Sequence, residues 1–161
     1  MNKEQMQANV ANINNLLREY KISNDGIERL ITKYKVSNYN TSMYDLLTST
    51  SVLENRTEGE LINFADLLKS HQYRFSVATI MMDKDIVSNR TFEEQLSLIQ
   101  VFKKYNYDNY IRYVVTSDYI AKNITFKKQL KLVENLVNSN YNEKVCNDII
   151  ENPELQLKLS K

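Results

Sequence analysis

Apolar residues recur along the chain at the spacing of amphipathic helices, and the whole pattern repeats every 34 residues. The stretch from Thr91 to Ile124 aligns without gaps on residues 57–90 before it and on residues 125–158 after it, and a fourth copy begins at Ser23. Within each copy, positions 8, 9 and 12 are apolar or aromatic and share one face of a helix. A fixed period of this length is typical of stacked supersecondary units.

A second apolar stripe follows at positions 21 and 24, and polar residues between the two stripes predict a turn. Each copy is therefore predicted to form helix A, a tight turn, helix B and a short apolar segment near position 30. Position 17 is tyrosine in every copy, namely Tyr39, Tyr73, Tyr107 and Tyr141. We expect this tyrosine to be buried where the helices meet.

Position 1 of every copy carries a hydroxyl residue, Ser23, Thr57, Thr91 or Thr125. Such hydroxyls accept hydrogen bonds from the first free amides of a helix, so position 1 is predicted to be an N-cap. In the second and third copies, Glu60 and Glu94 stand three residues later and complete the spacing of a capping box. Gly26 and Lys128 occupy that place in the other two copies, where weaker caps are expected.

The pattern predicts an all-α fold, a small right-handed helical-hairpin solenoid of four 34-residue repeats that start at residues 23, 57, 91 and 125. The repeats belong to a single domain spanning 1–161. Residues 1–22 do not match the repeat, and we interpret them as an N-terminal capping helix. Pro153 interrupts the last copy, so residues 153–161 are expected to form a C-terminal cap or a frayed tail.

The period and the hairpin unit resemble those of tetratricopeptide repeats. The chain departs from that family's residue pattern, because it has no Trp and carries Leu or Phe at position 8, where the family has Gly. The resemblance implies an architecture of tetratricopeptide-like size. It transfers no functional residue to this chain.

Composition bounds the function. A net charge of +1 gives no general attraction to nucleic acids or acidic membranes. The single cysteine, Cys146, rules out an intrachain disulfide and suits a reducing compartment. The first residues are too polar for a signal peptide, and no apolar run approaches the roughly 20 residues of a membrane span, so we expect a cytoplasmic protein. Abundant Asn, Lys, Ile and Tyr are typical of an AT-rich genome and favour a bacterial or phage origin.

No motif in the sequence predicts catalysis, a cofactor or a metal. His71 is the single histidine and has no second ligand residue at metal-binding spacing. Cys146 lies two repeats away from it, so no base is available to activate the thiol. Both residues are expected to be dispensable for function.

Tyrosines and cations gather between Lys103 and Lys131. Tyr110 and Tyr113 stand at repeat positions where the other copies carry polar residues, so both are expected to be at least partly exposed. Exposed tyrosine and arginine are frequent interface anchors. Tyrosines that cover the joint between two repeats are the structural alternative. The predicted partner-binding residues are Tyr110, Arg112, Tyr113, Lys103, Lys104, Lys127, Lys128 and Lys131.

The sequence favours a non-enzymatic protein–protein interaction module, a small regulator or inhibitor whose partner is another protein. The absence of a catalytic motif and the extended surface that solenoids offer support this expectation. The alternative is single-stranded nucleic-acid binding through the same tyrosine and lysine patch, which the near-neutral charge disfavours. An enzyme with an unrecognised site and a purely structural protein are the remaining alternatives.

Overall fold

The computed structural model describes residues 2–36, 46–70, 75–106 and 109–161. Within these ranges the regular secondary structure is helical and contains no strand, which confirms the predicted all-α class. None of the helices in these ranges is long and apolar enough to cross a membrane.

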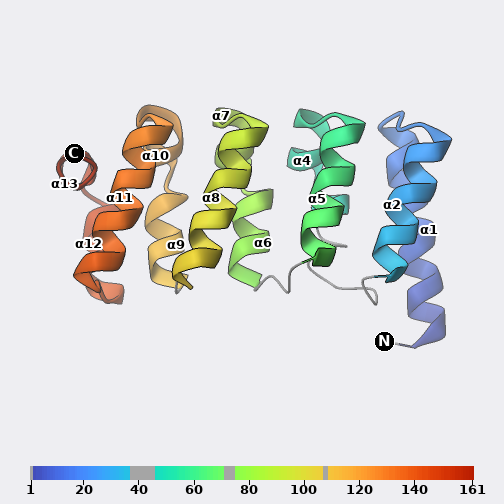
Figure 1. The fold of residues 1–161 in the computed structure, drawn as a ribbon, viewed down its shortest axis with the longest axis horizontal. Helices are drawn as coiled ribbons and strands as arrows, with labels where there is room; N and C mark the ends of the chain where they lie inside the picture. Colours follow the sequence, from blue (N-terminus) through green and yellow to red (C-terminus); the bar gives the residue numbers. More distant parts are fainter. Residues whose placement is uncertain (1, 37–45, 71–74, 107–108) are drawn as a thin grey trace. The chain divides into compact units, whose positions relative to one another are not determined.

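Five helices have 13 or more residues, and shorter helices lie between them (Figure 1). The longer ones are α1 (Lys3–Glu19), α2 (Asn24–Val36), α5 (Glu58–Ser70), α8 (Phe92–Tyr105) and α11 (Phe126–Ser139). The shorter ones are α4 (Thr50–Asn55), α6 (Phe75–Met82), α7 (Lys84–Asn89), α9 (Asn109–Val115), α10 (Asp118–Asn123), α12 (Glu143–Ile150) and α13 (Pro153–Leu159). The starts of α2, α5, α8 and α11 are successively 34 residues apart, and so are those of α4, α7 and α10.

The chain divides into two compact units, Met1–Ala78 and Thr79–Lys161. In the first unit, α1 packs against α2, and α2 packs against α5. Leu30 and Tyr34 of α2 are fully buried, together with Leu17 of α1 and Phe64 of α5. The Tyr34 hydroxyl accepts a hydrogen bond of 3.0 Å from the side-chain amide of Asn9, so the buried phenol also finds a polar partner.

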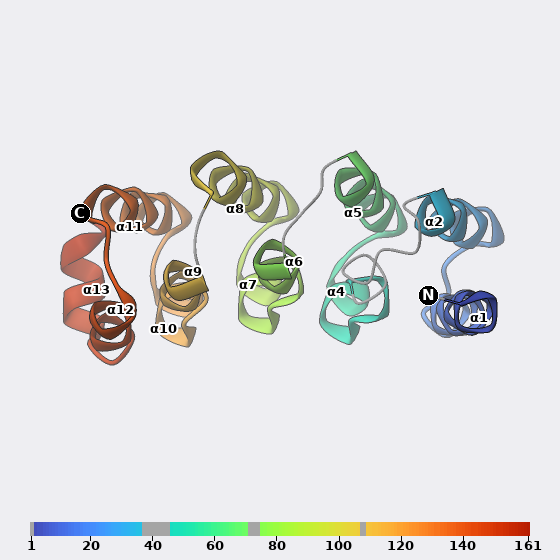
Figure 2. The ribbon, with the colours of Figure 1, turned by 90° about the horizontal axis from the view of Figure 1, so that it is seen from below.

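The second unit has two layers, with α8 and α11 in one and α7, α9, α10 and α12 in the other (Figure 2). Helix α9 packs against α11 and α12, and α7 packs against α8 and α10. The buried face of α9 contributes Ile111, Val114 and Val115 to the core, and α11 contributes Leu132 and Leu136. The apolar residues that recur at helical spacing therefore form the interface between the two layers.

Asparagines in the left-handed conformation end α8 and α11. Asn106 has φ 54° and ψ 53°, and Asn140 has φ 53° and ψ 50°. Asparagine tolerates this conformation better than most residues. The amides of Asn106 and Asn140 donate to the carbonyls of Phe102 and Leu136, so both helices end at the asparagine where the sequence predicts a turn.

The helix starts agree in part with the expected caps. Thr91 and Glu94 form the predicted capping box. In the preceding copy, the Thr57 hydroxyl accepts from the Glu60 amide at 3.2 Å, while the Glu60 carboxylate lies 3.7 Å from Arg56.

The two helix starts without a local glutamate differ from each other. The Thr125 hydroxyl accepts from the Lys128 amide at 3.3 Å. Ser23, which was expected to be a weak cap because Gly26 follows it, instead bonds to Glu58 of the neighbouring helix α5. The carboxylate of this cap comes from a different copy of the repeat. The residue spacing within one copy therefore could not predict it.

Three of the four repeat tyrosines, Tyr39, Tyr73 and Tyr107, lie outside the described residues. The fourth, Tyr141, is half-buried and not enclosed as expected. It stands in the turn between α11 and α12, flanked by two exposed asparagines, and turns of this kind lie at the surface.

Most of the C-terminal residues form a helix, α13. Pro153 takes the first position of α13, where its missing amide is not needed. Gln156 on this helix is fully buried, and its side-chain amide donates to the carbonyls of Ile149 and Ile150 at 2.8 and 3.1 Å. These bonds hold α13 against the end of α12.

Candidate partner-binding surface

Helix α9 presents two tyrosines to solvent. Tyr110 is 39% exposed and Tyr113 is 51% exposed, which confirms the partial exposure expected from their repeat positions. Ile111, Val114 and Val115 anchor the opposite face of the helix in the core. The rings are therefore displayed by a fixed element, which lowers the entropy cost of binding a partner.

Arg112 does not share that exposure, because only 8% of its surface is accessible. Its guanidinium carbon lies 4.1 Å from the centre of the Tyr113 ring, close enough for a cation–π interaction. Within the described residues, Arg112 Nε has no hydrogen-bond partner. Arg112 is thus a buried residue in contact with Tyr113, and its role in partner binding stays a prediction. A repeat pattern shows which positions are polar. It cannot show that the side chain of Arg112 is buried against the Tyr113 ring.

The end of α8 adds a third exposed aromatic residue. Tyr105 is 39% exposed, and Lys104 Nζ lies 5.2 Å from the centre of its ring. Lys103 and Lys104 occupy the last turn of α8 and are exposed, and cations there suit the helix dipole. Because α9 begins only four residues after Tyr105, we define Tyr105, Tyr110 and Tyr113 as the tyrosine surface.

The structure separates the remaining predicted lysines from the tyrosine surface. Lys127 and Lys128 lie in the first turn of α11, and Lys131 follows one turn later, all exposed. Helices α8 and α11 run side by side in the same direction, so the end of α8 and the start of α11 lie at opposite ends of the layer (Figure 1). A 14-residue helix is about 21 Å long. The eight predicted residues therefore form two separate groups.

The second group lines a groove of about 690 Å³ between α11 and the C-terminal residues. Asn135 of α11 donates a hydrogen bond to the Leu159 carbonyl and ties the two segments together. Four lysines line the groove, with one glutamate and one leucine among its other lining residues: Lys127, Lys128, Lys131, Lys161, Glu134 and Leu130. We call this feature the lysine groove. Lys161 was not predicted, because only the packing of α13 brings it next to α11.

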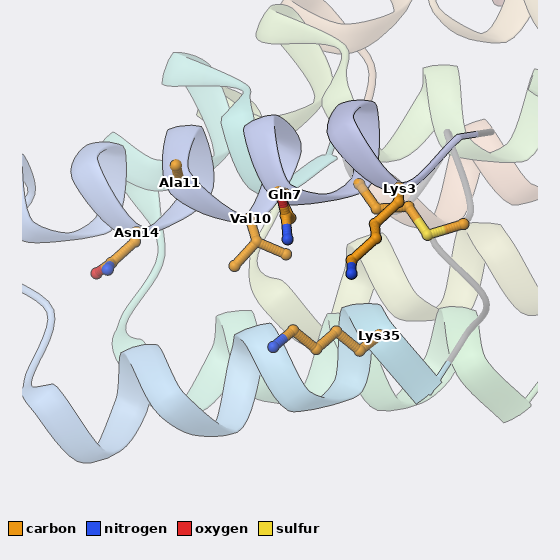
Figure 3. Close-up of a pocket in the computed structure, with 7 residues that line it drawn as sticks. Lys3, Gln7, Val10, Ala11, Asn14 and Lys35 are labelled. Carbon is orange, nitrogen blue, oxygen red and sulfur yellow. The ribbon is translucent and has the colours of Figure 1, made fainter.

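A smaller groove of about 500 Å³ lies between α1 and α2 (Figure 3). Val10 and Ala11 form part of its apolar lining, and Lys3 and Lys35 reach into it from the two helices. Among the described residues, no acidic side chain lines it. The sequence did not single out this groove, because its residues belong to the helix outside the repeat and to the first copy.

Side chains that commonly bind metals do not cluster within the described residues. Those residues contain no cluster of three or more His, Cys, Asp or Glu side chains that could hold a metal ion. Cys146 is 1% exposed on α12, so its thiol is shielded from substrates. His71 lies outside the described residues.

Carboxylates gather between α7 and α10. Asp83 caps α7 by accepting from the amides of Asp85 and Ile86 at 3.0 and 3.1 Å, and burial raises the pKa of its carboxyl. A hydrogen bond shared with Asp118 lowers the pKa of Asp85 and raises that of Asp118. Lys122 Nζ lies 3.3 Å from Asp85 and 3.9 Å from Asp118. The ion pair between Lys122 and Asp85 links α10 to α7.

Two buried glutamines were also missed by the sequence analysis. The side-chain amide of Gln95 donates to the Met81 carbonyl at 2.5 Å, and that of Gln129 donates to the Val115 carbonyl at 3.2 Å. Both side chains are fully buried, and both acceptors lie near the C-terminal end of a preceding helix. The sequence did hold a signal, because Ile27 and Leu61 occupy the same repeat position in the first two copies.

No family model, curated protein or solved structure matches this chain. The fold and the two surfaces are therefore the basis for assigning a function.

Proposed function

We propose that the protein is a non-enzymatic protein-binding module and that the tyrosine surface is its main contact region. The observation that carries this proposal is the display of Tyr110 and Tyr113, 39% and 51% exposed, on a helix whose other face is buried. Exposed tyrosines on rigid elements are frequent hot spots of protein interfaces. Arg112, held 4.1 Å from the Tyr113 ring, restricts that ring further.

We also propose that the helices form four copies of a 34-residue hairpin repeat, stacked as a small right-handed solenoid in one domain. The equal spacing of the starts of α2, α5, α8 and α11 supports this architecture. Deletion of residues 91–124 removes one complete copy without changing the register. The shortened chain is expected to keep its helical content per residue and to unfold cooperatively. A shortened chain that is unfolded would contradict the repeat.

The test of the binding proposal begins with capture of the partner. Affinity-tagged protein is exposed to extract from the native host, with and without nuclease, and the captured proteins are identified by mass spectrometry. The purified partner is then titrated against the wild type, Tyr110→Ala and Tyr113→Ala. Each substitution is expected to weaken binding by about 1–4 kcal/mol without lowering the melting temperature, because the rings are not part of the core.

Lys144→Ala and Asn147→Ala are the matched controls. These residues are exposed on α12, each 34 residues after one of the two tyrosines, and so occupy the same repeat positions. Neither substitution is expected to change affinity. Tyrosine variants that bind like the wild type would place the interface elsewhere, and a captured partner that disappears after nuclease treatment would contradict a protein interface.

Single-stranded nucleic acid is the second candidate, and it has less support. Such sites interleave aromatic rings and cations along one channel. Here the tyrosine surface lies at one end of the layer and Lys127, Lys128 and Lys131 lie at the other (Figure 1). Lys103 and Lys104 remain near the rings. Titration of oligothymidine at two salt concentrations tests this candidate, since each phosphate contact that is lost lowers the salt slope by about one.

A further inference from the structure

We propose that the lysine groove binds an acidic segment of the protein partner, at a location separate from the tyrosine surface. The inference rests on the proposed protein-binding function and adds the chemistry of the partner. The groove of about 690 Å³ is lined by Lys127, Lys128, Lys131 and Lys161, and Glu134 is the one acidic side chain among its described lining residues. The groove therefore has an excess of positive charge in a chain whose net charge is +1.

The described residues neutralise these cations only weakly. Lys131 lies 3.8 Å from Glu134, with 52% and 49% of the two side chains exposed, and an ion pair so open to water is weak. Within the described residues, no ion pair involves Lys127, Lys128 or Lys161. Exposed cations that converge on a concave surface produce a positive potential that attracts an anionic ligand.

The start of α11 also differs from the starts of the other long helices that follow α1. The first turn of α2 contains Asp25, and acidic residues likewise occupy the first turns of α5 and α8. The first turn of α11 contains no acidic residue and places Lys127 and Lys128 there. The helix dipole disfavours cations at this end, so local helix energetics do not explain the two lysines. An external anion would relieve the repulsion.

The shape and lining favour a peptide over a nucleic acid. None of the described residues that line the groove is aromatic, so bases would have no ring from them on which to stack. Leu130 supplies an apolar contact beside the lysines. A segment that alternates carboxylate and apolar side chains matches both features. Its carboxylates would pair with the lysine ammonium groups, while its apolar side chains would lie against Leu130.

The test uses the full chain and a short fluorescein-labelled peptide of alternating glutamate and leucine, followed by fluorescence anisotropy. The expected result is saturable binding that weakens as salt is raised, because the lysines are exposed. A peptide with glutamine in place of glutamate is expected to bind at least about tenfold more weakly. Equal binding of the two peptides would overturn the proposal, as would the absence of saturable binding.

The decisive variant combines Lys127→Glu with Lys128→Glu, which is expected to weaken binding of the acidic peptide at least about tenfold. The substitution places acids where the helix dipole favours them, so the melting temperature should stay the same or rise. Lost binding therefore cannot be attributed to unfolding. The control is Lys144→Glu, which changes an exposed lysine in the first turn of α12, outside the groove lining, and should leave peptide binding unchanged.

Three further outcomes separate this inference from the proposed function. If oligothymidine binds more tightly than the peptide and is lost in the Lys127→Glu, Lys128→Glu variant, the groove is a nucleic-acid site and the inference is wrong. If the native partner binds that variant like the wild type yet loses affinity for Tyr113→Ala, the protein-binding function stands and the groove inference fails. Peptide binding that is lost in the variant supports the groove even where the tyrosine substitutions have no effect.

Discussion

The carboxylate of Glu58 on α5 accepts two hydrogen bonds from Ser23, one from its amide at 3.1 Å and one from its hydroxyl at 2.9 Å. The Ser23 hydroxyl in turn accepts from the Gly26 amide at 3.0 Å, so α2 begins with a capping box whose acid comes from another helix. Gly26 leaves room for this acid. A β-carbon added to Gly26 would lie 2.4 Å from two atoms of the Glu58 carboxylate.

Gly26→Ala is expected to destabilise the protein, although alanine is favoured over glycine in a helix interior by about 1 kcal/mol. The new methyl group would displace the Glu58 carboxylate and break its bonds to Ser23. Gly59→Ala is the matched control, because the nearest atom to its added β-carbon is 4.0 Å away. That change should stabilise α5 by about 0.5–1 kcal/mol. Urea unfolding curves in which both substitutions are stabilising would contradict the steric argument.

The same pair of residues predicts a dependence of stability on pH. The amide and the hydroxyl of Ser23, followed by Arg29, hold the pKa of Glu58 below its ordinary value. A carboxyl whose pKa is lowered by folding stabilises the folded state. This stabilisation is fully present above the pKa of the unfolded state, about 4.3, and is lost as pH falls through the pKa of the folded state. We therefore expect the difference in unfolding free energy between the wild type and Glu58→Gln to shrink below about pH 4.3. If the difference in unfolding free energy stays constant from pH 7 to pH 3, the hydrogen bonds between Glu58 and Ser23 do not make stability depend on pH.

Gln129 is expected to be intolerant of an apolar replacement despite its complete burial. Its side-chain oxygen accepts from Arg90 Nε at 2.6 Å, and its amide donates to the Val115 carbonyl at 3.2 Å. Gln129→Leu would leave both partners without this bond, at a cost of about 1–3 kcal/mol. Gln100→Leu on the exposed face of α8 is the control and should change stability by less than about 0.5 kcal/mol. Equal unfolding midpoints for the two variants would contradict a structural role for the buried amide.

Asp83 is expected to make the protein less stable as pH rises. Burial is the largest cause that raises the pKa of the Asp83 carboxyl, and the charges of Asp85 and Asp118 raise it further. The two amide hydrogen bonds that the carboxylate accepts lower this pKa, but they do not cancel the rise. The folded state then binds the proton more tightly than the unfolded state, so stability declines between the unfolded pKa of about 3.9 and the raised folded value.

The variant Asp83→Asn tests this interpretation, because asparagine keeps the capping oxygen and removes the charge. It should equal or exceed the wild type in stability at pH 7 and should lack the decline. Asp83→Ala, which loses the cap, should cost about 1 kcal/mol at the same pH. If the stability of the wild type falls no more than that of Asp83→Asn as pH rises, the charge of Asp83 is not the cause of the decline.

The local structure of this protein was predictable because it is encoded at short range. The 3.6-residue spacing of apolar side chains specified the helices, and threonine at position 1 specified the starts of α8 and α11. Asparagine at the ends of these helices permitted the left-handed turn. Exposure of Tyr110 and Tyr113 followed from comparison with the polar residues at the same repeat positions.

What only the tertiary structure decided depends on residues that are distant in sequence or on the path of a long side chain. The burial of Arg112 beside the Tyr113 ring follows from the path of a long, flexible side chain. The separation of Lys103 from Lys127 follows from the direction in which α8 and α11 pack. The partnership of Ser23 with Glu58 spans 35 residues and replaces a local glutamate that the first copy lacks. Periodicity fixes which face of a helix is buried, but it leaves open which neighbour covers that face, and in this chain the neighbour determines both the caps and the candidate binding surfaces.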